Sequence, residues 1–211
     1  MTRAVIFDMD GALLRLEVDI EEVRLRLAAL FGPHGVTRPF RPILGRIYAA
    51  AVEAAARGAD AAALTRAGLD ILDGWEQKGA ADARARDGAA QVLRALSERG
   101  VQLGLYTAVG RAAVDVALAA SGIPATAFAA LVTRDDAAPK PDPAGLRLLA
   151  GHLGAERLVY IADHASDLAA ARAAAIANLE LVGVRSSLSP DDKLRAAGAT
   201  RVIGALAELL E

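Results

Sequence analysis

The chain has 211 residues, 54% of them hydrophobic and 24% charged, which suits one large domain or a core with a small insertion and excludes a disordered chain. Its formal net charge is −2 and its basic residues are spread along the chain, so we expect no nucleic-acid partner. The absence of cysteine excludes disulfides, thiolate catalysis and cysteine-ligated zinc. Because no leader peptide and no apolar stretch of membrane-spanning length is evident, we expect a cytoplasmic protein without a membrane partner. The composition leaves the oligomeric state open between monomer and dimer.

The first predicted element is a short buried strand that ends in two acids and a glycine. The strand residues Val5-Ile6-Phe7 are β-branched or aromatic, as in strands buried on both faces. Asp8 and Asp10 project to the same side of an extended backbone, where two carboxylates repel unless a cation or a shared proton separates them. Gly11 lets the backbone turn and bring its N–H groups close to a ligand. Alone, the stretch is also compatible with an Asp-Gly turn that caps a strand.

The next segment, from Arg15 to Lys78, lacks strand patterns, and its apolar residues recur at helical spacing. Gly and Pro interrupt this spacing, so the segment divides into several helices. We therefore expect a compact helical insertion, followed by a return linker over Ala80–Asp87. The predicted helices of the insertion are Ile20–Leu30, Ile47–Arg57 and Ala59–Trp75.

From Gly88 onward, helices and strands alternate, as in a parallel sheet with right-handed crossovers. The predicted fold is α/β, a doubly wound parallel sheet with a small all-helical cap inserted after the first strand. Residues 1–14 and 81–211 would form the core, and residues 15–80 the cap. The predicted helices are Ala89–Arg99, Gly110–Ser121, Pro143–Leu153, Asp167–Ala175 and Ala205–Leu210, and the strands are Val101–Thr107, Phe128–Thr133, Leu158–Asp163 and Leu179–Val184.

Polar side chains follow several of these strands, at the edge where ligands bind in doubly wound sheets. Thr107 ends one strand and Asp163 another, while Asp167 falls in the first turn of the next helix, where a carboxylate also suits the helix dipole. Lys140, one of three lysines, lies between two prolines in a loop. So many carboxylates at one edge would be destabilising without a divalent cation, and an all-oxygen ligand set suits Mg²⁺.

The motifs at the strand ends resemble, in order and spacing, those of the haloacid dehalogenase superfamily. The resemblance extends from Arg3 to about Leu210 and is specifically to capped, phosphoglycolate phosphatase-like members. Any one of the motifs is a weak signal, but four in order at predicted strand ends are a strong one. They are Phe7-Asp8-Met9-Asp10-Gly11, Leu105-Tyr106-Thr107, Lys140-Pro141-Asp142-Pro143 and Ala162-Asp163-His164-Ala165-Ser166-Asp167.

The resemblance implies a role for each matching residue. Asp8 would be the nucleophile that forms an aspartyl-phosphate, and Asp10 the acid and base for the leaving group and the hydrolytic water. Lys140 would neutralise charge on the nucleophile and on the phosphoryl group. Phosphate oxygens would be held by Thr107 and by backbone N–H groups near Gly11 and Ala108. The implied Mg²⁺ ligands are the Asp8 carboxylate, the Asp10 main-chain carbonyl and Asp163, with Asp167 in support.

The expected function is hydrolysis of a small phosphorylated metabolite, because the dehalogenase branch of the superfamily lacks an acid at the position of Asp10. A phosphosugar mutase of the same subfamily and a degenerate, non-catalytic binding protein are the alternatives. In the insertion, Arg46 is the candidate for binding a carboxylate or a second phosphate of the substrate. The alternative for Arg46 is an ordinary solvated helix residue.

Three residues depart from the family pattern. Ala12 replaces the usual Thr, Ala162 the usual Gly, and His164 a frequent Ser or Thr. Ala12 cannot donate the hydrogen bond that Thr supplies around Asp10, so we expect an active but slow enzyme. His164 would either touch the substrate or only line the rim of the site.

Overall fold

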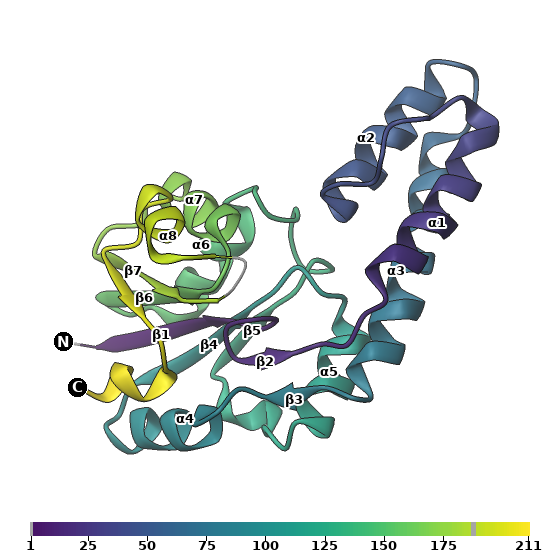
Figure 1. Cartoon of the computed structure of the whole chain (residues 1–211). Coiled ribbons are helices and arrows are strands. Elements are labelled where there is room, and N and C mark those ends of the chain that lie inside the picture. Colours follow the sequence, from purple (N-terminus) through teal and green to yellow (C-terminus); the bar gives the residue numbers. More distant parts are fainter. Residues whose placement is uncertain (1, 187–188) are drawn as a thin grey trace.

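Strand β1 (Arg3–Asp8) lies in the middle of a six-stranded parallel sheet with the order β5-β4-β1-β6-β7-β8 (Figure 1). The computed structural model describes residues 2–186 and 189–211, so residue 1 and residues 187–188 of the predicted core lie outside the described part. The other strands of the sheet are β4 (Gln102–Tyr106), β5 (Ala130–Val132), β6 (Arg157–Ala162), β7 (Leu179–Val184) and β8 (Arg201–Ile203).

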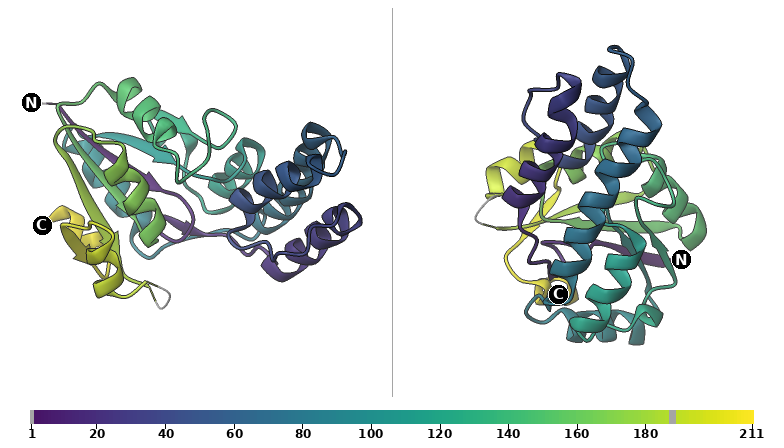
Figure 2. Two further views of the ribbon diagram at one scale, coloured as in Figure 1. Left: turned by 90° about the horizontal axis from the view of Figure 1, so that it is seen from above. Right: turned by 90° about the vertical axis from the view of Figure 1, so that its right-hand side faces the viewer.

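Helices cover both faces of this sheet, which confirms the predicted doubly wound α/β fold (Figures 1 and 2). Alternate residues of β1 serve the two sides: Val5 and Phe7 are buried in one hydrophobic core, and Ala4 and Ile6 in the other. The elements packed on the Val5 side are α4 (Ala89–Glu98), α5 (Arg111–Ala120) and the 3₁₀ helix η3 (Leu206–Leu210). Those on the Ile6 side are α6 (Ala144–Leu153), α7 (Ala165–Ala173) and α8 (Asp191–Ala196).

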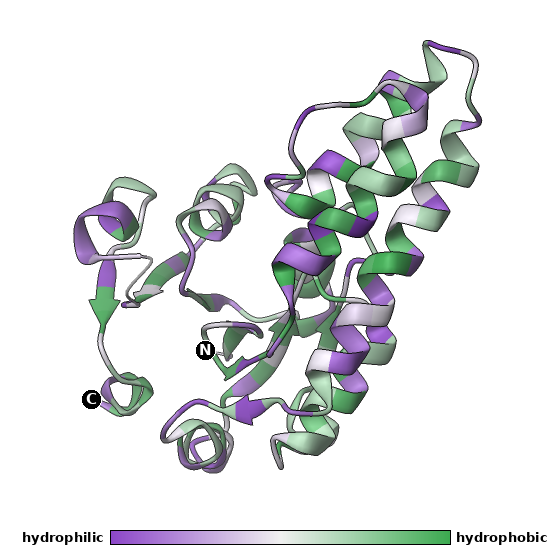
Figure 3. Ribbon diagram, turned by 45° about the vertical axis from the view of Figure 1, so that its right-hand side comes forward, coloured by the Kyte–Doolittle hydropathy of each residue, from purple (hydrophilic) through white to green (hydrophobic). Residues whose placement is uncertain are grey.

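A two-stranded antiparallel ribbon, β2 (Leu14–Arg15) and β3 (Arg84–Ala85), joins the sheet to a group of helices that we call the helical insertion. These helices have an apolar core of their own, and Figure 3 shows hydrophobic residues along all three α-helices. The last helix of the insertion, α3 (Ala61–Ala80), also packs against α5 and so contacts the sheet layer (Figure 2). The insertion consists of α1 (Ile20–Phe31), η1 (Gly32–His34), α2 (Ile43–Ala55) and α3 (Ala61–Ala80).

The structure corrects several predicted boundaries. The return linker over Ala80–Asp87 contains strand β3, because a two-residue strand has no alternating pattern to detect. For the same reason β2 and the three-residue strand β8 were not predicted, and the helix α8 was not predicted because six residues are too few to show helical spacing. Helix α2 begins at Ile43, directly after Pro42, since proline is tolerated at the start of a helix. The last predicted helix, Ala205–Leu210, is a 3₁₀ helix.

No helix within residues 2–186 and 189–211 is long and apolar enough to cross a membrane. The division into a core of residues 1–14 and 81–211 and a cap of residues 15–80 stays a prediction.

Candidate active site

The strand ends that carry the predicted site residues are neighbours in the sheet. Asp8, the last residue of β1, is paired with Tyr106 of β4, so Thr107 follows beside it. On the other side, Phe7 is paired with Ile161 of β6, and Asp163 comes directly after that strand. The carboxyl edge of the three central strands therefore gathers the nucleophile candidate, the hydroxyl and one of the supporting acids.

The predicted lysine reaches this edge from the loop before α6. Lys140 Nζ donates a hydrogen bond to Asp8 Oδ1 at 2.5 Å and lies 3.3 Å from Asp167 Oδ1. The Asp8 and Lys140 side chains are only 8% and 7% exposed, so little solvent screens their attraction. The structure thus joins three predicted residues that are separated by up to 159 positions in the chain, from Asp8 to Asp167.

Two tyrosines that sequence reasoning did not select surround the lysine. Lys140 Nζ donates to the hydroxyl of Tyr160 at 2.9 Å and lies 4.5 Å from the ring centroid of Tyr106. Both tyrosines are buried. Tyr160 lies in the strand that leads to Asp163, and the only sequence signal for it was a polar group in an otherwise apolar strand.

Burial and neighbouring carboxyl groups raise the pKa values of Asp8 and Asp163. Burial raises the pKa of Asp8, neighbouring Asp167 and Asp163 raise it further, and the ammonium of Lys140 opposes the rise. Burial, Asp167 and Asp10 together raise the pKa of Asp163 to about 6. Lys140 alone leaves excess negative charge here, which a bound cation would neutralise.

The turn after β1 brings Asp10 and Gly11 against the end of β6. Gly11 has a φ of +89°, and a Cβ atom there would lie 2.2 Å from Asp163 Oδ2, so no other residue fits this approach. Arg86 Nη1 donates to the Gly11 carbonyl at 2.6 Å, an anchor that no sequence pattern indicated. The turn is therefore fixed, and Asp10 and Asp163 line the same cavity.

Asp10 is held by a backbone group that the sequence did not reveal. Its Oδ1 accepts a hydrogen bond from the N–H of Leu16 at 2.9 Å. Desolvation by the surrounding protein raises the pKa of Asp10, and the Leu16 hydrogen bond partly opposes that rise. A raised pKa suits a group that must donate a proton to a leaving oxygen.

The loop after β4 presents the predicted phosphate donors. Thr107 is 2% exposed, and its Oγ1 accepts from the N–H of Val109 at 3.2 Å, which leaves the hydroxyl hydrogen available for a ligand. Within residues 2–186 and 189–211, the N–H of Ala108 donates no hydrogen bond. One hydroxyl and one amide thus remain available beside Asp8.

A cleft of about 1200 Å³ opens next to this edge, between the ribbon and the ends of β6 and β7. Asp10, Gly11, Asp163 and Asp167 line it, whereas Asp8, Thr107 and Lys140 are not among its lining residues, and the roles of all these residues stay predictions. His164 also lines it, and its Nδ1 accepts from the N–H of Ser166 as the N-cap of α7. His164 therefore lies at the rim of the cleft, as one of its two predicted alternatives had it. The residue that caps the N-terminus of α7 is His164 and not Asp167.

Arg46 lies in the first turns of α2, away from these aspartates in the chain and within the helical insertion. Its Nη2 donates to Glu53 Oε2 at 2.9 Å, and its guanidinium carbon lies 5.7 Å from the ring centroid of Phe40. The side chain is 9% exposed, so the alternative of a solvated helix residue is wrong. In the described part of the chain, its Nε and Nη1 are buried without a hydrogen-bond partner.

The predicted metal ligands fit a hard cation. Within the described ranges, no group of three or more His, Cys, Asp or Glu side chains is arranged to hold a metal ion. Three of the predicted ligands are side-chain carboxylates, those of Asp8, Asp163 and Asp167, and the described residues do not gather them as a metal site, so the ligand set stays a prediction. Carboxylate and carbonyl oxygens with retained waters are the ligands that Mg²⁺ prefers, and the pKa values of Asp8 and Asp163, both raised by burial and in part by neighbouring carboxylates, favour a cation at this edge.

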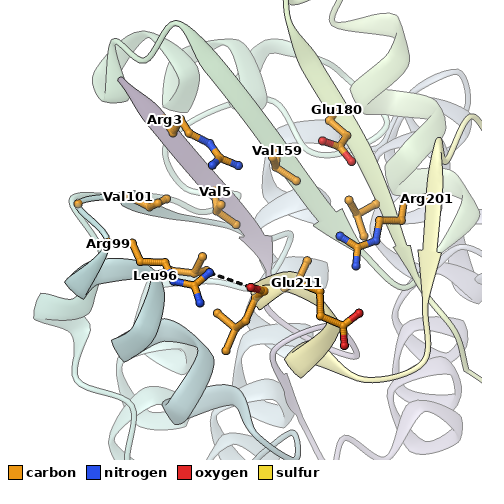
Figure 4. Close-up of a pocket in the computed structure, with 13 residues that line it drawn as sticks. Arg3, Val5, Leu96, Arg99, Val101, Val159, Glu180, Arg201 and Glu211 are labelled. Carbon is orange, nitrogen blue, oxygen red and sulfur yellow. Dashed lines mark hydrogen bonds between the residues drawn. The ribbon is translucent and has the colours of Figure 1, made fainter. Parts of the chain in front are cut away.

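A second cavity, of about 300 Å³, lies at the opposite, amino edge of the sheet (Figure 4). Arg3, Arg99 and Arg201 line it together with valines and leucines. The guanidinium of Arg99 is already engaged, since its Nη1 donates to the Leu210 carbonyl at 2.9 Å. None of the predicted site residues borders this cavity.

Known proteins resemble the chain over nearly its whole length. The family described as haloacid dehalogenase-like hydrolase matches residues 2–175. The "Uncharacterized protein in fgs 3'region" of Lacticaseibacillus casei is 32% identical over 200 residues, covering 93% of this chain and 91% of the relative. The structure of CbbY from Rhodobacter sphaeroides in complex with phosphate is 25% identical, with a TM-score of 0.67 and coverage of 99% of this chain and 96% of that chain. A hydrolase from Pseudomonas syringae is 22% identical with a TM-score of 0.68, covering 99% and 96%. The chain belongs to the haloacid dehalogenase-like hydrolases, as its motifs predicted.

Proposed function

We propose that the chain is a Mg²⁺-dependent phosphatase that hydrolyses a small phosphorylated metabolite through an aspartyl-phosphate. The observation that carries the proposal is the contact of Lys140 with Asp8 and Asp167 at the carboxyl edge of the sheet. A buried carboxylate beside an ammonium, with further acids at the same edge, is the arrangement that phosphoryl transfer needs. The structure of CbbY with bound phosphate supports the same class of ligand.

Two acids carry the bond changes. Lys140 holds Oδ1 of Asp8, so Oδ2 is the oxygen left to attack phosphorus. As the O–P bond to Asp8 forms and the bond to the leaving oxygen breaks, Asp10 gives its proton to that oxygen. Asp10 then takes a proton from the water that attacks the aspartyl-phosphate, which releases inorganic phosphate and restores Asp8.

The remaining groups bind and neutralise the phosphoryl group. The Thr107 hydroxyl and the Ala108 N–H would donate to its oxygens, and Gly11 lets the backbone of the preceding turn approach. Lys140 places its positive charge beside the oxygens that gain charge in the transition state. When bound, Mg²⁺ would supply further charge neutralisation and align the phosphoryl group. The residues that would hold it are Asp8, Asp10 through its carbonyl, Asp163 and Asp167.

The rest of the substrate would be recognised from the helical insertion. Two buried nitrogens of Arg46 have no protein partner in the described part of the chain, and burial of unsatisfied donors is unfavourable. Because these nitrogens are buried, a carboxylate or a second phosphate on the substrate would accept from them only after the insertion rearranges around Arg46. On this proposal, the substrate is a phosphorylated metabolite that carries a second anionic group.

The test is an assay with an aryl phosphate in Mg²⁺ and in EDTA, followed by a panel of phosphorylated metabolites. Asp8→Asn should lower kcat on the order of a thousandfold or more with an unchanged circular-dichroism spectrum. The matched control is Asp115→Asn on the exposed surface of α5, which should leave kcat unchanged. Conversion of a sugar 1-phosphate to its 6-phosphate would instead identify the chain as a phosphosugar mutase. If the folded protein turns over no substrate in Mg²⁺, the non-catalytic alternative holds.

A further inference from the structure

A buried ion pair connects the helical insertion to the loop between β5 and α6. Arg134 Nη1 donates to Glu76 Oε1 at 2.8 Å and its Nη2 donates to Glu76 Oε2 at 2.7 Å, while Asp73 also accepts from Nη2. The side chains of Arg134 and Glu76 are 2% and 9% exposed. Glu76 and Asp73 belong to α3, so this fork holds α3 against the sheet layer.

The same two side chains reach the loop that follows Thr107. Arg134 Nη1 also donates to the carbonyl of Ala108 at 2.7 Å, and Glu76 Oε2 accepts from the N–H of Gly110 at 3.1 Å. These groups belong to the two successive peptide units on either side of Val109. One ion pair therefore fixes both peptide planes. The first of them carries the N–H of Val109 that donates to Thr107 Oγ1, and the N–H of Ala108, which donates no hydrogen bond within the described residues, belongs to the peptide unit just before it.

The packing at Gly110 shows how close this contact is. A Cβ atom on Gly110 would lie 2.8 Å from Asp73 Oδ1 and 3.0 Å from Arg134 Nη2, so a side chain at this position would displace the ion pair. Burial raises the pKa of Glu76, and its hydrogen bonds with Arg134 oppose that rise. A buried ion pair generally adds little net stability compared with apolar residues of the same size, so stability alone is a poor explanation for it.

We propose that Glu76 and Arg134 are positioning residues of the phosphate site: they orient the peptide groups of residues 108–110 so that the Thr107 hydroxyl and the Ala108 N–H face the phosphoryl group. The proposal rests on the proposed function, because it takes Thr107 and Ala108 as phosphate donors. It also makes phosphate binding depend on where α3, a helix of the insertion, is held against the sheet.

The experiment separates positioning from stability by replacing the whole ion pair. Arg134→Met alone leaves the Glu76 carboxylate buried and unpaired, so it should lower the Tm. In the double variant Glu76→Leu/Arg134→Met, apolar groups of similar volume should restore most of that loss. Binding of inorganic phosphate in Mg²⁺, measured by calorimetry, should stay about tenfold weaker than in the wild type in both variants. As a control, Arg147→Met removes hydrogen bonds to Ala173 and Ala174 carbonyls elsewhere and should lower the Tm without changing phosphate affinity.

Hydrogen exchange supplies a readout that needs neither activity nor phosphate. The N–H groups of Val109 and Gly110 should exchange faster in the double variant, whereas those of the central sheet should not change. Wild-type phosphate affinity and wild-type exchange in a folded double variant would overturn the proposal. If the double variant does not fold, Glu76→Gln, which preserves shape but removes one acceptor, must show the same faster exchange at Gly110. If the wild type neither binds phosphate nor hydrolyses aryl phosphate, the proposed function fails, and the exchange measurement still decides whether the pair orients the loop.

Discussion

The hydroxyl of Tyr160 lies 2.9 Å from Nζ of Lys140 and accepts a hydrogen bond from it. Tyr160 is fully buried, and its ring centroid is 6.1 Å from that of Tyr106. The ammonium of Lys140 also lies over the ring of Tyr106. The ammonium that contacts Asp8 is thus held by an oxygen from β6 and a ring from β4. Its direction depends on these two residues as much as on its own loop.

The first prediction is that Tyr160→Phe lowers kcat about tenfold and changes KM little. Removing the hydroxyl leaves one N–H of a buried ammonium without its acceptor, and a hydrogen bond to a charged group contributes roughly 1.5–3 kcal/mol. Steady-state kinetics with an aryl phosphate provide the measurement. Tyr106→Phe is the control, because within the described part of the chain the hydroxyl of Tyr106 makes only a long contact of 3.5 Å, with the Asp142 carbonyl. Equal kcat values for Tyr160→Phe and the wild type would contradict the positioning of Lys140 by this hydroxyl.

The second prediction concerns pH and Mg²⁺. In the metal-free protein the pKa of Asp163 is raised to about 6, above its unfolded value of 3.8, so the folded state binds this proton more tightly. Stability should therefore rise as the pH falls from 7.5 to 5.5, and the raised pKa values of Asp8 and Asp10 act in the same direction. Bound Mg²⁺ requires ionised carboxylates, so its stabilising effect should shrink over the same interval.

Thermal unfolding at pH 5.5 and 7.5, with and without Mg²⁺, measures both effects. The Mg²⁺-induced rise in Tm should be larger at pH 7.5, and Asp163→Asn should lose most of it. Asp163→Asn should also flatten the pH dependence in the metal-free protein. A Mg²⁺ effect of the same size at both pH values would exclude Asp163 as a ligand.

The residues that the sequence predicted best are those whose position follows from strand order. Asp8, Thr107 and Asp163 each end or follow a strand of a parallel sheet, so topology alone brings them to one edge. Lys140 was found by its rarity and its proline-framed loop, and the structure shows the expected contact with Asp8. These signals are short stretches of sequence, although the residues they mark come from distant parts of the chain.

The features that the sequence did not predict depend on contacts between distant segments or on backbone groups. Leu16 holds Asp10 through its N–H, which any residue except proline would supply, so no residue type reveals it. Glu76 and Arg134 are 58 positions apart, and each alone is an ordinary charged residue in a charged chain. The burial of Arg46 likewise follows from the packing of the insertion helices and not from its immediate neighbours.

The third prediction tests Arg46 as the contact for a second anionic group. Arg46→Met keeps much of the volume but removes the charge, so kcat/KM for the true metabolite should fall about ten- to a hundredfold. A simple aryl phosphate, which lacks the second anion, should be hydrolysed at the wild-type rate. Arg57→Met is the control in the same insertion, since Arg57 is exposed and, within the described residues, its side chain donates only to the Glu53 carbonyl. Equal losses for both substrates, or the same loss in Arg57→Met, would exclude substrate binding by Arg46.

The last prediction concerns Ala12, where the family usually has Thr. Loss of the threonine hydroxyl predicts a loosely held Asp10 and a slow enzyme, but the N–H of Leu16 already holds Oδ1 of Asp10 at 2.9 Å. Ala12 is fully buried in the core under β1, where the extra atoms of threonine would be overpacked at a cost of about 1–3 kcal/mol.

Ala12→Thr should therefore lower the Tm by several degrees and change kcat less than about twofold. The comparison needs two substrates, an activated aryl phosphate and an alkyl phosphate, because only the poor leaving group requires the proton from Asp10. Ala12→Ser, which adds the hydroxyl without the methyl group, separates the effect of the hydrogen bond from that of packing. A tenfold rise in kcat for the alkyl phosphate alone, in either variant, would show that the Leu16 hydrogen bond does not hold Asp10 in the geometry that proton transfer needs.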